Sequence, residues 1–425
     1  MSGIVVVGGG QAAATLVARL RSKGHEGPIT LIGEEPVPPY QRPPLSKGYL
    51  LGDMALERLF LRPESWYADN GVTLRLGQPV TAIDTAARTV TAGGEALSYD
   101  HLALTTGAIP HRLPASIGGA LGGVHVVRTL ADVDAMAPDL KPDGRALIVG
   151  GGYIGLEAAA VARKLGLRVT LVELADRILQ RVACPETSAW FRALHTAQGV
   201  DLREGTGLER LTGGGRVSGA RLSDGSELAI DVAIVGVGVA PATALAQTAG
   251  LTIDNGIAVD DRGRTSAPHV WAAGDCTSFP WRGRRIRLES VQNAIDQAEA
   301  VADNMLGADT PYDAKPWFWS DQYDAKLQIA GLNTGYDRIV TRPGEHETAV
   351  SFWYYGDDTL LAVDAMNDSR AYMVGKRLIE MGRTPDPAAI ADPATNLKAV
   401  SYTHLTLPTT DVGGWGGGGG GGGGG

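Results

Sequence analysis

The chain has 425 residues, of which 44% are hydrophobic and 20% charged, and its formal net charge is −9. This length predicts two or three domains, and the balanced composition excludes a disordered or fibrous protein for most of the chain. The acidic balance argues against broad nucleic-acid binding, which needs a basic surface. No apolar run reaches the roughly 18 residues of a membrane span, and no signal-peptide pattern follows Met1. We therefore expect a cytoplasmic protein.

Cysteine usage limits the redox chemistry of the chain. The two cysteines, Cys184 and Cys276, form neither a C-x-x-C nor a C-x₄-C pair. We therefore expect no disulfide framework and no cysteine relay of the kind that disulfide-reducing enzymes use. Each cysteine is expected to be a small buried side chain, and no metal site is predicted.

Two similar segments predict a pair of Rossmann-like modules. The first reads as strand, glycine turn, helix and strand, at 4–7, 8–10, 12–20 and 29–32. The second repeats this order at 146–149, 150–152, 154–165 and 169–172. Each is the pattern of a βαβ unit. We predict an α/β fold in which a discontinuous first dinucleotide-binding domain, over 1–110 and 241–316, encloses a second, over 111–240.

The last quarter of the chain has a different pattern. Strands are expected at 326–330, 349–354 and 359–363, followed by a helix at 369–381. They predict a C-terminal α+β domain over 317–397. Residues 398–425 end in a glycine run that cannot bury enough surface to order itself, so we expect a disordered tail, whose composition points to a non-native origin.

The first glycine loop fits G-x-G-x-x-A. Gly8 permits the tight turn, Gly10 lets a pyrophosphate approach the backbone, and Ala13 keeps the helix close to the sheet. Glu34, at the end of the second strand, is expected to accept hydrogen bonds from ribose hydroxyls. The alternative is that Glu34 and Glu35 are two solvated loop acids.

The second loop is a complete G-x-G-x-x-G match formed by Gly150, Gly152 and Gly155. Glu173 follows at the end of the next strand. A carboxylate there binds the adenosine ribose and repels a 2′-phosphate, so NADH is the expected donor. Arg177 would permit some NADPH use if it folded over the ribose, but we expect an exposed arginine.

Two further turns indicate ligand contact with the main chain. Residues 105–108 and 272–275 each follow an apolar strand and consist of small residues. Asp275 closes the second turn and is expected to accept a hydrogen bond from a ribityl hydroxyl. Either turn alone would be common, but together with both glycine loops they are specific.

Three segments carry a family resemblance that covers roughly residues 4–396. They are PYQRPPLSK at 39–47, RLESVQNA at 287–294 and PWFWSDQY at 316–323. With these segments the sequence resembles the two-dinucleotide flavoproteins, and among them the ferredoxin reductases that serve monooxygenases and aromatic-ring dioxygenases. The resemblance implies FAD and NADH as cofactors and a [2Fe-2S] ferredoxin as partner.

The resemblance also implies roles for single residues. It places FAD contacts at Ala12, Glu34, Arg42, Lys47, Val80, Arg128, Asp275 and Val291. It places NAD contacts at Gly152, Tyr153, Ile154, Gly155 and Glu173, with the turn at Gly238 near the nicotinamide. Ala242 stands where many relatives have asparagine, a departure that we do not expect to abolish cofactor binding.

Three residues are the predicted catalytic set. By analogy Lys47 lies near flavin N5, where a positive charge stabilises the reduced flavin, and Glu157 pairs with it. Trp319 is expected at the flavin edge, as a shield or on the electron exit path. The alternatives are an exposed lysine at a helix start and ordinary core packing for the other two.

The electron acceptor follows partly by elimination, because no cysteine pair is available. Ferredoxins are usually acidic, so an acidic reductase needs a local basic face. The candidates for that face are Arg282, Arg284, Arg285, Arg287 and Lys326. An ordinary solvated charged face is the alternative.

Two other functions stay open at this point. One is an NADH oxidase or small-molecule reductase that uses oxygen, a quinone or a dye. The other is a flavin redox sensor that resembles apoptosis-inducing factor. Two intact nucleotide loops make a purely structural role improbable.

Overall fold

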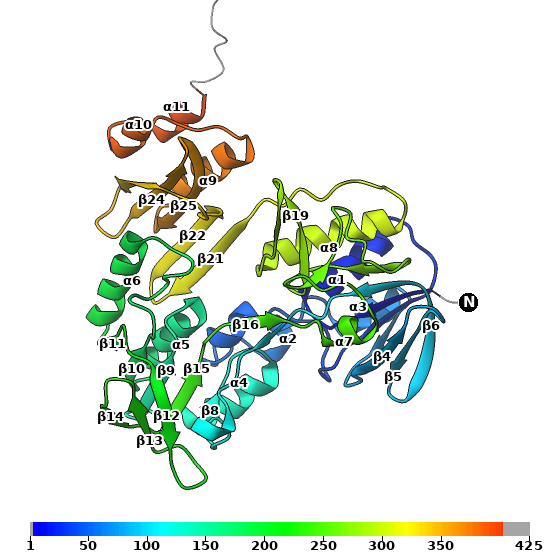
Figure 1. The fold of residues 1–425 in the computed structure, drawn as a ribbon, viewed down its shortest axis with the longest axis horizontal. Helices are drawn as coiled ribbons and strands as arrows, with labels where there is room; N and C mark the ends of the chain where they lie inside the picture. The colour runs from blue at the N-terminus through cyan, green and yellow to red at the C-terminus, as the bar shows by residue number, and fades with distance from the viewer. Residues whose placement is uncertain (1–2, 403–425) are drawn as a thin grey trace, which may run out of the picture.

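The computed structural model describes residues 3–402, and these form three parts (Figure 1). One part, at the right of the view, combines early and late segments of the chain, a second lies at the lower left, and the C-terminal segments form a third above it. The expected α/β architecture, with two dinucleotide-binding modules and a C-terminal α+β domain, is confirmed. Within the described residues, no helix is long and apolar enough to cross a membrane.

The first module is built on a seven-stranded sheet in the order β3-β2-β1-β6-β5-β4, in which β18 also pairs with β6. Its strands are β1 (Gly3–Val7), β2 (Ile29–Ile32), β3 (Val72–Arg75), β4 (Val80–Asp84), β5 (Thr89–Ala92), β6 (Glu95–Leu104) and β18 (Val270–Ala272). β1 pairs in parallel with β2 and β6. Val5 and Val6 are both buried, as expected for central parallel strands that are covered on both faces.

Two helices pack side by side on this sheet, α1 (Gln11–Ser22) and α8 (Val291–Met305). α1 buries Ala13, Leu16, Val17 and Leu20, the spacing of one face of an amphipathic helix. Shorter helices complete the module, α2 (Leu56–Leu59), α3 (Glu64–Asp69) and α7 (Ala244–Thr248).

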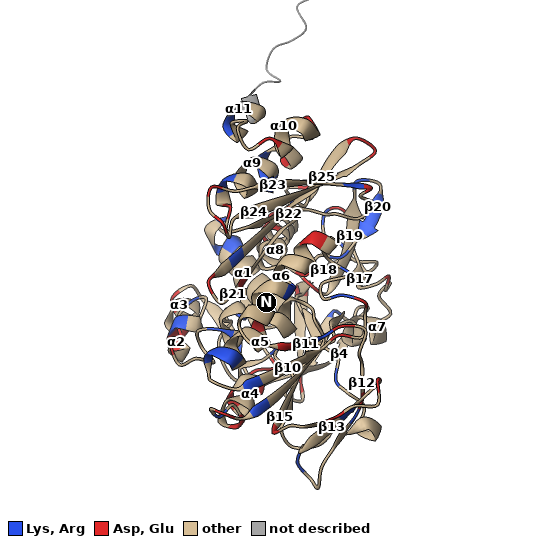
Figure 2. Cartoon of the chain, turned by 90° about the vertical axis from the view of Figure 1, so that its left-hand side faces the viewer, with Lys and Arg blue, Asp and Glu red and all other residues tan. Residues whose placement is uncertain are grey.

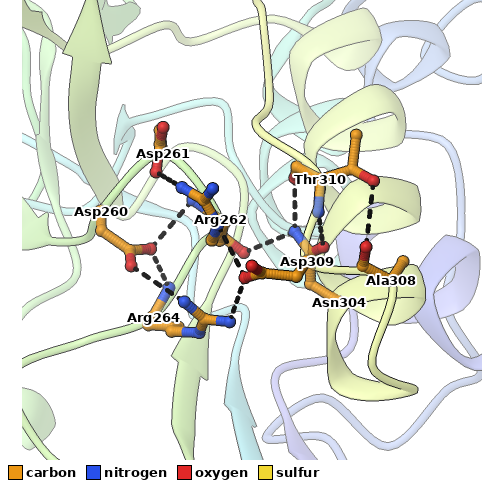
Figure 3. A network of polar contacts seen from close by, with 8 residues as sticks. All are labelled: Asp260, Asp261, Arg262, Arg264, Asn304, Ala308, Asp309 and Thr310. Atoms are coloured by element: carbon orange, nitrogen blue, oxygen red, sulfur yellow. Dashed lines mark hydrogen bonds and ion pairs between the residues drawn. The ribbon is translucent and has the colours of Figure 1, made fainter.

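A network of polar and charged side chains holds the C-terminal end of α8 against a neighbouring loop (Figure 3). Asp309 Oδ1 accepts hydrogen bonds from Arg262 Nε at 2.7 Å and Arg264 Nη2 at 2.6 Å. Asn304 Nδ2 donates to the carbonyl oxygens of Arg262 and Thr310. Exposed ion pairs contribute little one at a time, but a connected set holds a geometry. The network therefore ties the 260–264 loop to α8, whose opposite end lines the site described below.

The second module has a five-stranded sheet in the order β11-β10-β9-β15-β8. Its strands are β8 (Val124–His125), β9 (Arg145–Val149), β10 (Arg168–Val172), β11 (Asp201–Arg203) and β15 (Val232–Val235). Its helices are α4 (Leu130–Met136), α5 (Tyr153–Lys164) and α6 (Pro185–Ala197), and a small sheet consists of β12 (Leu208–Thr212), β13 (Gly219–Leu222) and β14 (Glu227–Ala229). Both predicted βαβ units are thus present, with boundaries within one or two residues of those expected.

The chain crosses between the two modules twice, and the crossings are paired. β7 (Ala108–Pro110) leaves the first module and β16 (Val239–Pro241) returns to it, and the two form an antiparallel ribbon. A further small sheet follows, made of β17 (Ile257–Ala258), β19 (Thr277–Trp281) and β20 (Arg284–Ile286). The domain limits at 110 and 240 remain our proposal.

The C-terminal domain is an antiparallel sheet in the order β21-β22-β25-β24-β23 with α9 packed on it. Its elements are β21 (Trp317–Gln322), β22 (Ala325–Gly331), β23 (Arg338–Pro343), β24 (Val350–Gly356), β25 (Thr359–Met366) and α9 (Ser369–Glu380), followed by α10 (Pro387–Ala391). The predicted strands and helix of this domain are confirmed.

The expectation of a disordered tail from residue 398 is wrong at its start. α11 (Leu397–Tyr402) is helical, and it packs against α9. Leu397 is buried in the core of the C-terminal domain, with Val400 packed beside it. Apolar burial orders this turn. Residues 403–425 lie outside the described residues.

Candidate functional site

A cavity of about 1010 Å³ lies where loops from all three parts of the molecule converge. Its walls come from the loops at the carboxyl ends of β1, β2, β6 and β18, from the start of α8, and from β21. Fourteen of the predicted site residues line it: Gly8, Gly10, Ala12, Glu34, Arg42, Lys47, Val80, Arg128, Tyr153, Ile154, Glu157, Asp275, Val291 and Trp319. The edge formed by the carboxyl ends of parallel strands is where such sheets bind ligands.

The first glycine loop has the shape that a pyrophosphate needs. Gly8 has φ +120°, and a Cβ there would lie 2.3 Å from the Thr105 carbonyl oxygen. A Cβ at Gly10 would meet nothing within 4 Å. The first glycine is therefore required by close packing, and the second faces open space. Ala13 is fully buried between α1 and the sheet, outside the cavity lining.

The start of α1 adds a favourable electrostatic field. Gly10 is its N-cap, with no side-chain hydrogen bond at the cap and no acidic residue in the first turn. The amide groups of the first turn therefore remain available to an anion in the cavity.

A hydrogen-bonded group that the sequence did not reveal supports Arg42. Arg42 Nη2 donates to Glu35 Oε1 at 2.7 Å and Nη1 donates to the Arg128 carbonyl oxygen at 2.7 Å. Tyr40 donates to the other Glu35 oxygen at 2.6 Å and accepts from the Leu130 amide. Glu35 is thus a structural partner rather than a solvated acid, while Glu34 is exposed at the cavity wall.

Asp275 and Arg128 form a loose pair in the cavity. Their closest atoms, Asp275 Oδ2 and Arg128 Nη2, are 3.7 Å apart. Burial raises the pKa of Asp275, and Arg128 opposes that rise. Burial also lowers the pKa of Arg128, with the neighbouring Arg42 adding to the effect. The pair can therefore exchange its mutual contact for bonds to a polar ligand.

Lys47 and Glu157 meet as predicted. Lys47 follows a single 3-10 turn (Pro43–Ser46) that two prolines begin. Its Nζ lies 2.7 Å from Glu157 Oε2. Ser46 donates to the same oxygen at 3.2 Å, and Ser320 donates to Glu157 Oε1 at 2.7 Å. Glu157 is buried and fully supplied with donors, so it anchors the ammonium group at the cavity wall.

Aromatic side chains close the cavity on the side of the C-terminal domain. Phe318 and Trp319 of β21 line it, and the Phe318 ring lies 4.9 Å from the Tyr153 ring between centroids. Trp317 continues the series, with 5.5 Å between its centroid and that of Trp319. Trp319 therefore lines the cavity, and its place at the flavin edge remains a prediction.

The second glycine loop lies outside this cavity, although Tyr153 and Ile154 reach its lining. A Cβ at Gly155 would lie 2.0 Å from the Gly150 carbonyl oxygen, and one at Gly150 would lie 2.4 Å from the Gly236 carbonyl oxygen. A Cβ at Gly152 would meet nothing within 4 Å. The loop therefore repeats the arrangement of the first, with a tightly packed first glycine and an open middle one.

Glu173 holds the second loop in place. Its carboxylate accepts from the Gly151 amide at 2.7 Å and from the Ala175 amide at 2.8 Å. The expectation of an exposed Arg177 is wrong, because its guanidinium donates to Ser188 Oγ and to the Ala183 carbonyl oxygen. Leu174, beside Glu173, is 75% exposed. Gly238 has φ +96° and follows β15 on the return crossing.

Comparison with known proteins identifies the family. Residues 2–298 match the pyridine nucleotide-disulphide oxidoreductase family, and residues 317–401 match the reductase C-terminal family. The chain belongs to the pyridine nucleotide-disulphide oxidoreductase family.

Relatives of named function align with nearly the whole chain. The chain is 43% identical to the ferredoxin reductase subunit of 5,5'-dehydrodivanillate O-demethylase from Sphingobium sp., over 93% of this chain and 98% of the relative. It is 42% identical to rhodocoxin reductase from Rhodococcus erythropolis, over 92% of each. The structure also matches the covalent putidaredoxin reductase–putidaredoxin complex, with TM-score 0.91, 38% identity and coverage of 95% of this chain and 98% of that chain. The resemblance to ferredoxin reductases is confirmed.

The cavity and the glycine loops fit the cofactors of this oxidoreductase family. FAD and a nicotinamide dinucleotide are its cofactors. A large cavity, an open glycine at the start of α1 and a partly buried carboxylate at Asp275 fit FAD. The open Gly152 at the start of α5 fits the nicotinamide dinucleotide.

The cysteines of this oxidoreductase do not form a redox pair. Cys184 and Cys276 are both free and buried, and burial raises the pKa of each thiol. Raised thiol pKa values and burial are the marks of inert structural cysteines. The expectation that each cysteine is a small buried side chain is confirmed.

The predicted basic face is only partly free. Arg282 and Arg284 are exposed, and their guanidinium groups lie 4.6 and 5.6 Å from the Trp281 ring centroid. Arg285 donates to the Ser278 carbonyl oxygen, and Arg287 pairs with Glu289. Figure 2 shows β20 as a basic strand at the edge of the molecule. Lys326 is also exposed, in the C-terminal domain.

Proposed function

We propose that the protein takes a hydride from NADH onto FAD and passes the electrons, one at a time, to a [2Fe-2S] ferredoxin that feeds a monooxygenase or dioxygenase. The relatives named as ferredoxin and rhodocoxin reductases support this activity, because they align over nearly their full length. The reaction balances: one NADH and two oxidised ferredoxins give NAD⁺, two reduced ferredoxins and one proton.

The observation that carries the proposal is the convergence of Lys47, Glu157 and Trp319 at one cavity. Lys47 comes from the first module, Glu157 from the second and Trp319 from the C-terminal domain. Because the site is assembled from three parts of the molecule, it can combine dinucleotide binding, charge stabilisation and contact with an acceptor. Because the two cysteines are buried and free, no thiol relay competes for the electrons.

The protein groups in the proposal bind, orient and exclude water. FAD supplies the hydride acceptance and the one-electron release when bound. Gly10 and the start of α1 would hold its pyrophosphate, and Asp275 would accept a hydrogen bond from its ribityl chain. The Lys47 ammonium places positive charge beside the flavin. Tyr153 and Phe318, in contact at 4.9 Å between centroids, keep water from the second module's side.

For the acceptor we propose docking at the hairpin of β19 and β20, through Arg282 and Arg284. These two side chains are exposed, and stacking on Trp281 restricts their motion. The segment that follows β20 leads directly to Glu289 and Val291 at the cavity. Arg285 and Arg287 support the hairpin instead, since other groups already bind them. Lys326 is retained as a peripheral contact.

The proposal is tested by reducing the purified flavoprotein with NADH or NADPH, with and without a [2Fe-2S] ferredoxin coupled to cytochrome c. We expect rapid flavin bleaching with NADH and cytochrome reduction that depends on ferredoxin. Rapid bleaching with no gain from several ferredoxins would reject the acceptor and favour an oxidase or small-molecule reductase. NADH-dependent dimerisation with slow turnover would favour the redox sensor. The cytoplasmic location expected from the sequence remains a prediction.

A further inference from the structure

Behind the Lys47–Glu157 pair lies a buried chain of hydrogen bonds that the proposed reaction does not explain. Ser320 donates to Glu157 Oε1 at 2.7 Å, and Gln322 Nε2 lies 3.1 Å from Ser320 Oγ. Gln322 Oε1 in turn lies 2.7 Å from His195 Nε2. Ser320, Gln322 and His195 are each at most 1% exposed. Tyr323 ends the series, with its hydroxyl 3.4 Å from His195 Nδ1.

The donors and acceptors of this chain have one consistent direction. An ionised Glu157 only accepts, so the Ser320 hydroxyl donates to it. The Gln322 amide nitrogen only donates, so it donates to the Ser320 oxygen. Its carbonyl oxygen then needs a donor, which is the Nε2–H group of His195. Nδ1 is left to accept from Tyr323, so every bond points toward Glu157.

The placement of these residues follows from two repeating periods. On β21, Phe318, Ser320 and Gln322 lie on the same face, because every second residue of a strand points to the same side. On α5, Tyr153 and Glu157 are one helical turn apart. Phe318 contacts Tyr153 and Ser320 contacts Glu157. Two residues along the strand therefore correspond to one turn of the helix. His195, near the end of α6, meets the next strand position, Gln322.

Burial favours the neutral form of His195, which this series of hydrogen bonds requires. Burial lowers its pKa, and the bond to Gln322 opposes that effect. A neutral imidazole has one donor and one acceptor nitrogen, and the bond made at one fixes the tautomer at the other. The groups facing this ring are neutral: Gln322 and the Tyr323 hydroxyl, whose own pKa burial raises to about 12.

We propose that His195, Gln322 and Ser320 are positioning residues that hold the Glu157 carboxylate in one orientation, and through it the Lys47 ammonium in place at the flavin. The inference rests on the proposed function only in taking FAD as the group beside Lys47. It gives a role to three residues of α6 and β21 that belong to no cofactor-binding motif and do not line the cavity.

Proton export is the alternative use of such a chain, and two features argue against it. The side-chain amide of Gln322 has no ionisable proton to pass on, which interrupts a relay. The bonds also all donate toward Glu157, so the chain is set to support a negative charge there rather than to receive a proton from it. A positioning role needs only that the hydrogen bonds donate in this direction.

The first test measures the midpoint potential of the FAD-loaded enzyme by spectroscopic titration. Gln322→Met keeps the side-chain length without the hydrogen bonds, and His195→Leu removes the donor. We expect both to weaken stabilisation of the reduced flavin about tenfold, which for two electrons is a shift of about 30 mV to more negative potential. His195→Gln, which can still donate at the Nε2 position, should restore the wild-type potential.

Ser351→Ala is the matched control, because Ser351 is fully buried in the same domain and its hydroxyl oxygen accepts a hydrogen bond from Trp353 Nε1, away from Glu157. It should leave the potential unchanged. FAD content and melting temperature identify variants that fail to fold. An equal shift in Ser320→Ala and Ser351→Ala, or a wild-type potential in both Gln322→Met and His195→Leu, would overturn the proposal.

A second readout does not depend on turnover or on any ferredoxin. In protein labelled with ¹⁵N-histidine, the His195 signal is identified by its loss in His195→Gln. We expect a neutral ring with the Nε2–H tautomer between about pH 6 and pH 8. An imidazolium or an Nδ1–H tautomer at pH 7 would overturn the direction of the chain. If no ferredoxin accepts electrons while both readouts behave as expected, only the proposed function fails.

Discussion

Lys47 Nζ lies 2.7 Å from Glu157 Oε2, and this ion pair joins the first module to α5 of the second at the cavity wall. Glu157 is the more buried partner, with 9% of its side chain exposed against 23% for Lys47. The two residues are 110 positions apart in sequence. The pair therefore links the two modules and also sets the charge beside the flavin.

Lys47→Met should lower the flavin midpoint potential and slow its reduction by NADH at least about tenfold. Removing the ammonium takes a stabilising charge from the reduced flavin and leaves Glu157 with only its hydroxyl donors. That loss should cost roughly 1–3 kcal/mol of stability. The measurements are stopped-flow flavin reduction and spectroscopic potentiometry. Lys164→Met is the control, since Lys164 is 64% exposed on the same helix as Glu157. Equal potentials for the two variants would contradict the prediction.

The second glycine loop separates a folding requirement from a binding requirement. Gly155→Ala should destabilise the protein, because its Cβ would lie 2.0 Å from the Gly150 carbonyl oxygen. Gly152→Ala should leave the melting temperature unchanged, because nothing lies within 4 Å, but should raise the KM for NADH about tenfold or more by blocking the pyrophosphate. Both should retain FAD. An unchanged KM in Gly152→Ala would reject this loop as the dinucleotide site.

The sequence predicted the local parts of the site because they depend on short-range geometry. The glycine loops combine tight turns, open faces and helix starts within a few residues, so a motif is enough to locate Gly8, Gly10 and Gly155. The Lys47–Glu157 pair required the family resemblance, since no local rule joins residues 110 positions apart.

Contacts that depend on how loops fold back and how modules pack together were not predicted. Glu35 resembles a solvated acid until the fold places Arg42 and Tyr40 against it. His195 and Gln322 belong to different modules, and only the assembled structure brings them together. Arg177 was wrongly expected to be exposed, because the carbonyl groups that bind it are presented by a loop without regular structure.

Glu173→Gln should weaken the preference for NADH over NADPH. The glutamine oxygen can still accept one of the two amide bonds that Glu173 makes with Gly151 and Ala175. The charge that repels a 2′-phosphate is lost, which near a surface is worth roughly 1 kcal/mol, or about fivefold. The measurement is kcat/KM for both donors. Glu209→Gln, on β12, is the control, and an unchanged NADH/NADPH ratio would show that Glu173 does not face the ribose.

Reversing the charges at Arg282 and Arg284 should raise the KM for ferredoxin about tenfold at low salt. Both guanidinium groups are exposed above Trp281, so they present charge without a competing ion pair in the described structure. Flavin reduction by NADH should not change, because neither side chain lines the cavity. The effect should shrink at high salt, where surface charges are screened.

The matched control for this docking surface is Arg62→Glu. Arg62 also stacks on a tryptophan, with its guanidinium 4.4 Å from the Trp66 centroid, but it lies beside α3. A rise in the ferredoxin KM of the same size in this control would indicate a general charge effect. An unchanged KM in the Arg282→Glu/Arg284→Glu variant would place docking elsewhere.

Asp364 should make stability depend on pH. It is 1% exposed, and burial raises its pKa to about 6, although Tyr354 and Thr187 donate to it. The unfolded carboxyl has a pKa near 3.9, so the folded state binds the proton more tightly. Its contribution is therefore fully present below about pH 4 and is lost as pH rises through about 6.

Asp364→Asn should remove this loss, because an amide can accept the same hydrogen bonds without becoming charged. Relative to wild type, the variant should gain stability on the order of 3 kcal/mol between about pH 4 and pH 7. Melting temperatures of the FAD-loaded protein across this range measure the gain. Asp357→Asn, at an exposed turn of the same domain, should show a constant offset. A constant offset for Asp364→Asn as well would mean that Asp364 does not titrate in this range in the folded protein.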